Sequence, residues 1–214
     1  MSIKSFIKKM IASAVVIAAL YGAFVKAEEQ KKAEINLRYN ALETLVTEDG
    51  DVRYRLLSNV DFNIDDFRVG YSGLNEANNL DEDTYFGRHA LLLSKEDSGT
   101  SLAAVIKTTK DGAIDKKIGI RNTSLVNKLG GYGRIDAVAD GDAANLTAFY
   151  GRPFGRGFSA ELYHSLEIPF EGKPGHYTEV QVNKDISAWL SLVGRVEIRN
   201  FRDTAFMGGI AIKK

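Results

Sequence analysis

Three histidines are the side chains in this sequence whose unperturbed pKa lies near neutrality, which makes them the first candidates for acid–base chemistry. His164 is followed directly by Ser165, but neighbours on a β-strand point to opposite faces, so the two cannot form a Ser–His pair. His164 and His89 stand among apolar residues, which is typical of packed or interfacial histidines, and His176 follows Gly175 at an expected turn. We therefore expect that the chain is not an enzyme. A lipid-modifying enzyme that uses His164 or His89 is an alternative.

Cofactor and metal chemistry find no support in the sequence. The chain contains no cysteine, which excludes disulfides, thiolate metal sites and an acylated lipoprotein N-terminus. No G-x-S-x-G, H-E-x-x-H or P-loop pattern occurs. Lysine plus arginine and aspartate plus glutamate both number 28, so no basic excess points to nucleic acid. We expect no cofactor, no metal ion and no nucleic-acid partner.

Arginine and glutamate residues recur at every second position between apolar residues, which is the spacing of one face of a β-strand. In a barrel of such strands they would line the lumen. There they would either set the ion preference of a narrow pore, or pair into a network that plugs a lumen too small for free water flow. A barrel of about eight or ten strands favours the plug and one of about twelve favours the pore. The lumen-facing candidates are Arg38, Arg53, Arg55, Arg68, Arg88, Arg121, Glu161, Glu167, Glu179, Arg195, Glu197 and Arg199.

The elements that would position these side chains are strands that follow one another from Glu34 to the C-terminus. In residues 158–170 (FSAELYHSLEIPF), apolar and polar residues alternate with a two-residue period. Asp-Gly and Gly-Asp pairs, as in 48–51, 110–112 and 140–142, supply the positive φ angles of tight hairpins. We predict an all-β, antiparallel up-and-down β-barrel of about twelve strands, with eight to twelve possible. The polar run 75–83 is expected to form the longest outer loop.

An export signal precedes the strands. Lys4, Lys8 and Lys9 form a basic start, residues 10–20 are apolar, and Ala27 stands at the expected cleavage position. A retained membrane anchor is the alternative, although the apolar stretch is shorter than the roughly 20 residues that a spanning helix needs. The predicted organisation is a signal peptide at 1–27, a short polar segment at 28–33 and a β-barrel domain at 34–214.

The two faces of the expected strands differ in kind, but alternation alone does not say which face meets the solvent. One face is apolar, as at Tyr54, Leu56 and Leu192, while the other carries the charged candidates and Asn40. In a membrane barrel the apolar face contacts lipid, whereas in a soluble barrel it points inward. Aromatics near the expected strand ends, such as Phe158 and Phe170, favour the membrane because they suit interfacial girdles.

The chain resembles small Gram-negative outer-membrane β-barrel proteins of the porin-like class over about residues 34–213. The segments that carry the resemblance are AELYHSLEIPF (160–170), DISAWLSLVGRVEIRN (185–200) and TAFMGGIAIKK (204–214). Barrels of this class usually finish on an aromatic residue that the assembly machinery is thought to read, whereas this chain ends in Lys213-Lys214. The resemblance implies a location in the outer membrane, with the lipid of that membrane as a partner and small solutes as possible cargo.

The expected function is therefore a passive pore or a structural role in the cell envelope. The alternative is a soluble periplasmic barrel of lipocalin-like form, which would bind an apolar ligand in its interior. The sequence indicates no particular solute, ligand or oligomeric state.

Overall fold

The computed structural model describes residues 34–64, 66–79, 81, 84–95 and 98–213. The predicted signal peptide at 1–27 and the polar segment at 28–33 lie outside the described residues. The described residues form twelve strands and one short helix, α2 (Ser124–Asn127). The strands are β1 (Glu34–Thr47), β2 (Val52–Ile64), β3 (Phe67–Asn78), β4 (Phe86–Lys95), β5 (Thr100–Thr109), β6 (Gly112–Asn122), β7 (Tyr132–Ala139), β8 (Ala143–Gly155), β9 (Phe158–Pro169), β10 (Gly175–Asp185), β11 (Leu190–Arg199) and β12 (Asp203–Lys213).

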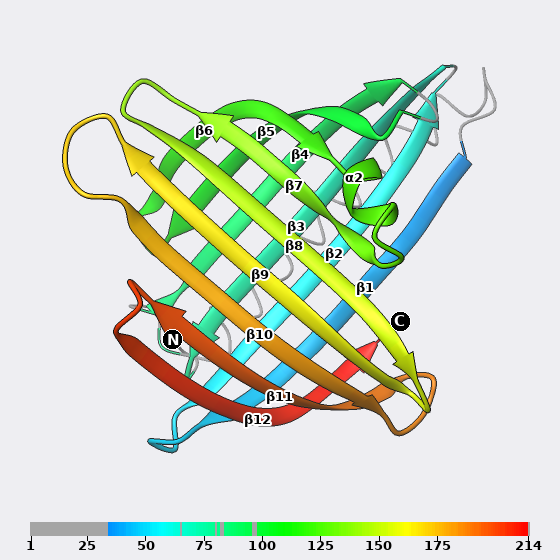
Figure 1. Cartoon of the computed structure of the whole chain (residues 1–214), viewed down its shortest axis with the longest axis vertical. Helices are drawn as coiled ribbons and strands as arrows, with labels where there is room; N and C mark the ends of the chain where they lie inside the picture. The colour runs from blue at the N-terminus through cyan, green and yellow to red at the C-terminus, as the bar shows by residue number, and fades with distance from the viewer. Residues whose placement is uncertain (1–33, 65, 80, 82–83, 96–97, 214) are drawn as a thin grey trace.

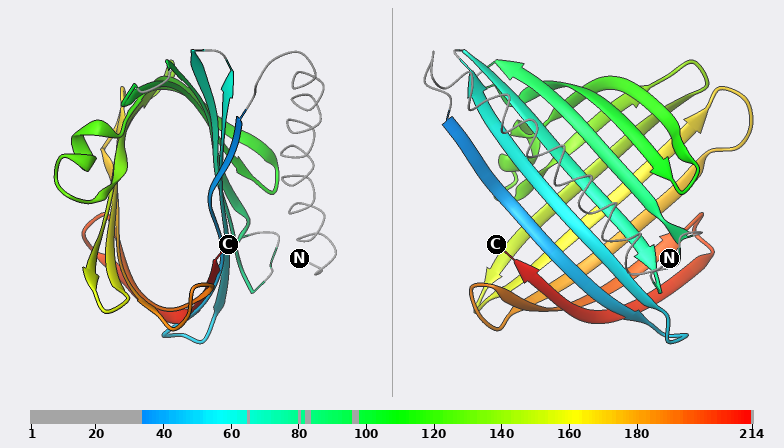
Figure 2. Two further views of the ribbon diagram at one scale, coloured as in Figure 1. Left: turned by 90° about the vertical axis from the view of Figure 1, so that its right-hand side faces the viewer. Right: turned by 180° about the vertical axis from the view of Figure 1, so that it is seen from behind.

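The strands form one closed antiparallel barrel (Figure 1). Each strand pairs with its neighbour in the sequence, because the connections are too short for a parallel crossover. The last strand, β12, closes the ring on β1 through pairs that run from Ala41–Lys213 to Thr47–Met207. Seen end-on, the ring is oval, with β2 and β3 on the side opposite to β8 and β9 (Figure 2). The predicted up-and-down barrel of twelve strands is confirmed.

Turn chemistry explains most of the hairpins. Gly112 adopts a φ of 114° where β5 turns into β6, in the left-handed region that favours glycine. The β11–β12 turn is built differently, with Asn200 at φ 49° and Phe201 at φ 57°, and the Arg202 N–H donates to the carbonyl of Arg199 at 3.0 Å. Two successive positive φ angles define a type I′ turn, whose twist matches that of the flanking strands.

Two connections differ from the sequence-based expectation. The predicted outer loop at 75–83 is shorter than expected, because Asn75 to Asn78 continue β3 and pair with Leu56 to Arg53 of β2. The connection between β6 and β7 contains α2, which was not predicted and lies outside the ring (Figure 2). Its first turn is held by the Asn122 side chain, whose Oδ1 accepts the Leu125 N–H at 3.0 Å. Among the described residues, no helix is long and apolar enough to span a bilayer.

A β-bulge in β1 corrects one predicted face. The register between β1 and β2 shifts between Leu37 and Tyr39, which places one extra residue on β1. Beyond the bulge, Asn40 pairs with Ser58 and therefore shares a face with Leu56, not with the charged residues as expected. Alternation predicts a face only as far as the next bulge.

The inside and the outside of the barrel have opposite chemistry. Large apolar side chains project outward along the strands, with exposed fractions such as 73% at Ile118. The inward positions hold charged side chains, including Glu43, Asp136 and Arg195, that are almost fully buried. Two small apolar clusters interrupt this polar lining, one around Leu45 and Met207 and the other around Ala103, Val105 and Val138.

Candidate functional site

The barrel encloses a cavity of about 840 Å³, which is within the usual range for a small-molecule site. Its lining comes from inward positions on most of the strands. Eight of the twelve predicted lumen residues line the cavity: Arg53, Arg55, Arg88, Glu161, Glu167, Glu179, Arg195 and Arg199. Three groups of ionised side chains each contribute residues to the wall of this cavity.

The largest group, here called the Arg–Glu network, consists of Arg53, Arg55, Arg195, Glu43, Glu76, Glu179 and Glu197. Arg55 binds Glu179 through two parallel contacts, Nη1–Oε1 at 3.0 Å and Nη2–Oε2 at 2.9 Å, and its Nε lies 2.5 Å from Glu76. Arg53 pairs with Glu197, and Arg195 pairs with Glu43. Two-point arginine–carboxylate contacts fix both partners in orientation, so this network is a rigid part of the lumen wall.

Small residues on β12 allow the Arg–Glu network to form. Strands β10 and β11 supply Glu179, Arg195 and Glu197, whereas their partners come from β1, β2 and β3. Strand β12 lies between these two groups in the ring, and its inward positions are Ala205, Met207, Gly209 and Ala211. Because most of these side chains are short, the long side chains of β2 and β11 can meet across β1 and β12.

The second group is the arginine cluster, in which Arg88, Arg121 and Arg134 converge on Asp136. Arg121 makes a two-point contact, Nε–Oδ1 at 2.7 Å and Nη2–Oδ2 at 3.0 Å. Arg88 Nη2 lies 3.1 Å and Arg134 Nε 3.4 Å from Oδ2 of the same carboxylate. Asp136 is fully buried, whereas Arg134 stays partly accessible and its guanidinium lies 5.5 Å from the centroid of the Phe149 ring. Three positive charges thus share one negative charge.

The third group lies near the β5–β6 and β7–β8 turns. Lys107 contacts Asp115 at 2.9 Å and Glu167 at 3.3 Å, and Lys117 contacts Asp115 at 2.7 Å and Asp140 at 2.8 Å. Asp140 lies in the β7–β8 turn, where its Oδ1 also accepts the backbone N–H groups of Asp142 and Ala143 at 2.8 Å. The hydrogen bond from Lys117, followed by these two backbone donors, holds the pKa of Asp140 well below its usual range.

The remaining predicted residues lie beside these groups. Arg121 belongs to the arginine cluster and Glu197 to the Arg–Glu network, while Arg68 lies 3.7 Å from Asp61. The side chain of Arg38 lies outside the described part of the chain. That the twelve residues together decide what enters the lumen stays a prediction.

Sequence reasoning missed Glu43, Glu76, Arg134 and Asp136. Arg134 and Asp136 could have been found, because they alternate with Gly133 and Ile135 as the other candidates alternate with their neighbours. Glu43 is harder to find, since it follows the β-bulge that resets the alternation in β1.

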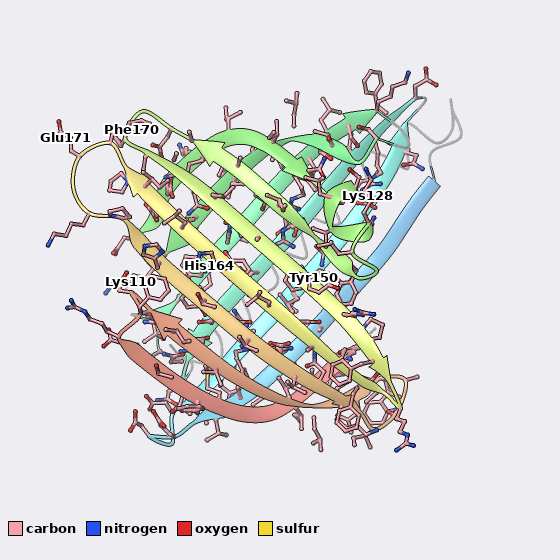
Figure 3. All side chains as sticks on the ribbon, in the orientation of Figure 1. Lys110, Lys128, Tyr150, His164, Phe170 and Glu171 are labelled. Carbon is pink, nitrogen blue, oxygen red and sulfur yellow. The ribbon has the colours of Figure 1, made fainter. Side chains whose placement is uncertain are left out.

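The histidines lie on the outside of the barrel, away from the cavity. His164 lies on β9 (Figure 3). It shares its outward face with Thr178, whose Oγ1 lies 2.8 Å from His164 Nδ1. His89 Nδ1 lies 2.8 Å from the hydroxyl of Tyr71, which is also on the outward face. Ser165 lines the cavity instead, so it is separated from His164 by the barrel wall. In the described ranges, no group of three or more histidine, aspartate or glutamate residues is arranged to hold a metal ion.

Aromatic side chains project at both ends of the barrel. Trp189 in the β10–β11 turn and Phe154 near the β8–β9 turn are more than half exposed at one end. Phe170 and Phe201, in the β9–β10 and β11–β12 turns, are similarly exposed at the other end. Two aromatic girdles flanking an apolar band are typical of a barrel embedded in a bilayer. The class-level resemblance to porin-like barrels is confirmed.

Comparisons with known proteins identify no family. No family model matches the chain, and no curated protein matches it significantly. Among solved structures, the KdgM porin aligns over 82% of this chain and 98% of its own, with 10% identity and a TM-score of 0.48. A mutant of the Rh. blastica porin aligns over 86% of this chain and 100% of its own, with 9% identity and a TM-score of 0.42. These likenesses are too distant to support a function.

Proposed function

We propose that the chain is an outer-membrane barrel that acts as a passive pore for small solutes. The observation that carries the proposal is the combination of an apolar exterior with a charged cavity of about 840 Å³ inside the closed ring. The predicted export signal at residues 1–27 supports the Gram-negative outer membrane as the location. The proposed role requires no catalytic residue, and no particular solute is part of it.

The geometry argues against the lipocalin-like alternative. A soluble carrier of apolar ligands needs an apolar interior and a polar exterior. Here the largest fully buried side chains include Glu43, Glu197 and Asp136, while Leu102, Ile118 and many other apolar side chains are exposed. A structural envelope role remains the second candidate, because the Arg–Glu network fills part of the lumen.

Planar-bilayer recording distinguishes a pore from a structural barrel. The purified protein is expected to insert and give stepwise currents, and its folded band on a gel is expected to shift on boiling. A boiling shift without any current would overturn the pore and leave the structural role. A protein that stays soluble without detergent and shows no shift would overturn the membrane location.

Single-cysteine variants identify the conducting path, because the natural chain has no cysteine to interfere. Ser72 lines the cavity, so the anionic thiol reagent sulfonatoethyl methanethiosulfonate is expected to lower the current through Ser72→Cys. Leu192 is half exposed on the outward face, and Leu192→Cys is the matched control. Equal responses of the two variants would contradict conduction through this cavity.

A further inference from the structure

Two parts of the cavity wall carry charge that the ion pairs around them do not balance. Arg88 and Arg134 reach the cavity from the arginine cluster on β4, β6 and β7, where three guanidiniums contact the carboxylate of Asp136. This part of the wall therefore carries an excess of positive charge. Its natural ligand is an anionic oxygen group, which arginine binds in a planar, two-point geometry.

The complementary negative charge is Glu161 on β9. Its Oε1 accepts the hydroxyl of Tyr132 at 2.6 Å, and it also lines the cavity. Within the part of the chain that the structure describes, no lysine or arginine nitrogen lies within 4.0 Å of this carboxylate. The neighbouring Arg–Glu network pairs its three arginines with four carboxylates, Glu43, Glu76, Glu179 and Glu197, so it carries no excess positive charge that would neutralise Glu161. Glu161 thus has capacity to bind a cationic group.

Aromatic side chains occupy the wall between these two charged positions. Arg134, Phe149 and Tyr163 are register partners on β7, β8 and β9, and Phe149 and Tyr163 both line the cavity. Glu161 is two residues from Tyr163 on the same face of β9. Strand spacing and rise then put the Cα atoms of Arg134 and Glu161 about 12 Å apart. Leu57 and Leu74, on β2 and β3, add apolar surface to the same cavity.

We propose that the lumen binds a small linear zwitterion, with its carboxylate on Arg134 and Arg88, its ammonium group on Glu161 and its apolar body against Phe149 and Tyr163. This assignment deepens the proposed pore function and rests on it for the route by which the solute arrives. Binding itself depends only on the folded barrel. A solute with one charge would contact one end of the site and bring no counter-charge to the other end.

Calorimetry on the folded protein in detergent tests the assignment with three probes of similar length. The probes are 6-aminohexanoic acid, hexanoic acid and hexylamine, which carry both charges, the carboxylate alone and the ammonium alone. The zwitterion is expected to bind at least about tenfold more tightly than either control, since each charge-assisted contact contributes about 1.5 kcal/mol or more. If hexanoic acid binds as tightly as 6-aminohexanoic acid, the site recognises an anion and not a zwitterion, and the proposal is overturned. Absence of heat with all three probes would overturn the proposal.

Variants connect the affinity to the two charged positions. Glu161→Gln is expected to weaken the binding of 6-aminohexanoic acid about tenfold and to leave the binding of hexanoic acid unchanged. Arg134→Gln is expected to weaken the binding of both acids. Tyr132→Phe removes the hydroxyl that orients Glu161, and should weaken the zwitterion by a smaller factor. Arg202→Gln, at an exposed turn position, is the control. A boiling shift on gels verifies that each variant is folded. Equal losses for Arg202→Gln and Glu161→Gln would contradict the site.

Conductance of the same protein separates this inference from the proposed function. Current without zwitterion binding would overturn the site and leave the pore intact. Zwitterion binding without current would overturn the pore and retain the binding site.

Discussion

Arg55 on β2 and Glu179 on β10 form a two-point ion pair across the lumen, although 124 positions separate them in the chain. The pair spans the seam at which β12 closes on β1, as do the contacts of Arg53 with Glu197 and Arg195 with Glu43. Among the described residues, seven pairs join β1 to β12, whereas twelve join β1 to β2. The Arg–Glu network therefore reinforces the shorter of the two strand pairings that β1 makes.

Removing one partner of this ion pair should weaken the barrel. Glu179→Gln leaves Arg55 and Arg195 buried with one carboxylate fewer to balance their charge. We expect the free energy of unfolding to fall by about 3 kcal/mol, which is typical of a broken buried ion pair. The measurement is the temperature at which the folded gel band converts to the unfolded one. Arg199→Gln is the control, because Arg199 is 58% exposed and its 3.6 Å contact to Glu197 should contribute little. Equal melting of the two variants would show that the network does not hold the seam.

Two adjacent glycines on β12 give a matched test of the seam. A Cβ added at Gly209 would lie 1.9 Å from the carbonyl oxygen of Thr44 and 2.8 Å from Cα of Leu45 on β1. Among the described residues, a Cβ at Gly208 would meet only the carbonyl oxygen of Val193, at 3.9 Å. Gly209→Ala is therefore expected to lower the yield of the closed, heat-shifting form strongly, and Gly208→Ala to leave it almost unchanged. A similar yield from both variants would contradict close packing at the seam.

The ion pair between Asp140 and Lys117 should make stability depend on acid pH. Because the pKa of Asp140 is lowered in the folded protein, its contribution is complete above the unfolded value near 4 and is lost as the pH falls through the folded value. The barrel should melt at progressively lower temperature below about pH 4. Asp140→Asn should flatten this dependence while lowering stability at neutral pH. An unchanged acid profile in Asp140→Asn would assign the dependence to other carboxylates.

The sequence predicts the barrel well because a two-residue period and tight turns each have a local physical cause. Glu179 and Arg195 were placed correctly on one face by alternation, since their strands contain no bulge. Asn40 was placed incorrectly, because the bulge before it depends on how β1 meets β2. The pairing of Arg55 with Glu179 follows from the tilt of the strands and from the size of the residues on β12. Neither the strand tilt nor the size of the β12 residues can be inferred from the sequence around Arg55 or Glu179, so the ion-pair partners could not be predicted.

The arginine cluster allows a direct test of whether charged side chains in the lumen set the ion preference of the pore. Asp136 is the one carboxylate on which Arg88, Arg121 and Arg134 converge, so Asp136→Asn leaves three guanidiniums without their shared partner. We expect the reversal potential in a salt gradient to move toward anion preference, because the cavity beside Arg88 and Arg134 becomes more positive. The same substitution should lower stability by about 3 kcal/mol, yet single-channel recording samples only barrels that have folded and inserted. Asp203→Asn removes the same charge at the exposed start of β12 and should shift the potential much less. Equal shifts would mean that net charge, and not the arginine cluster, sets the preference.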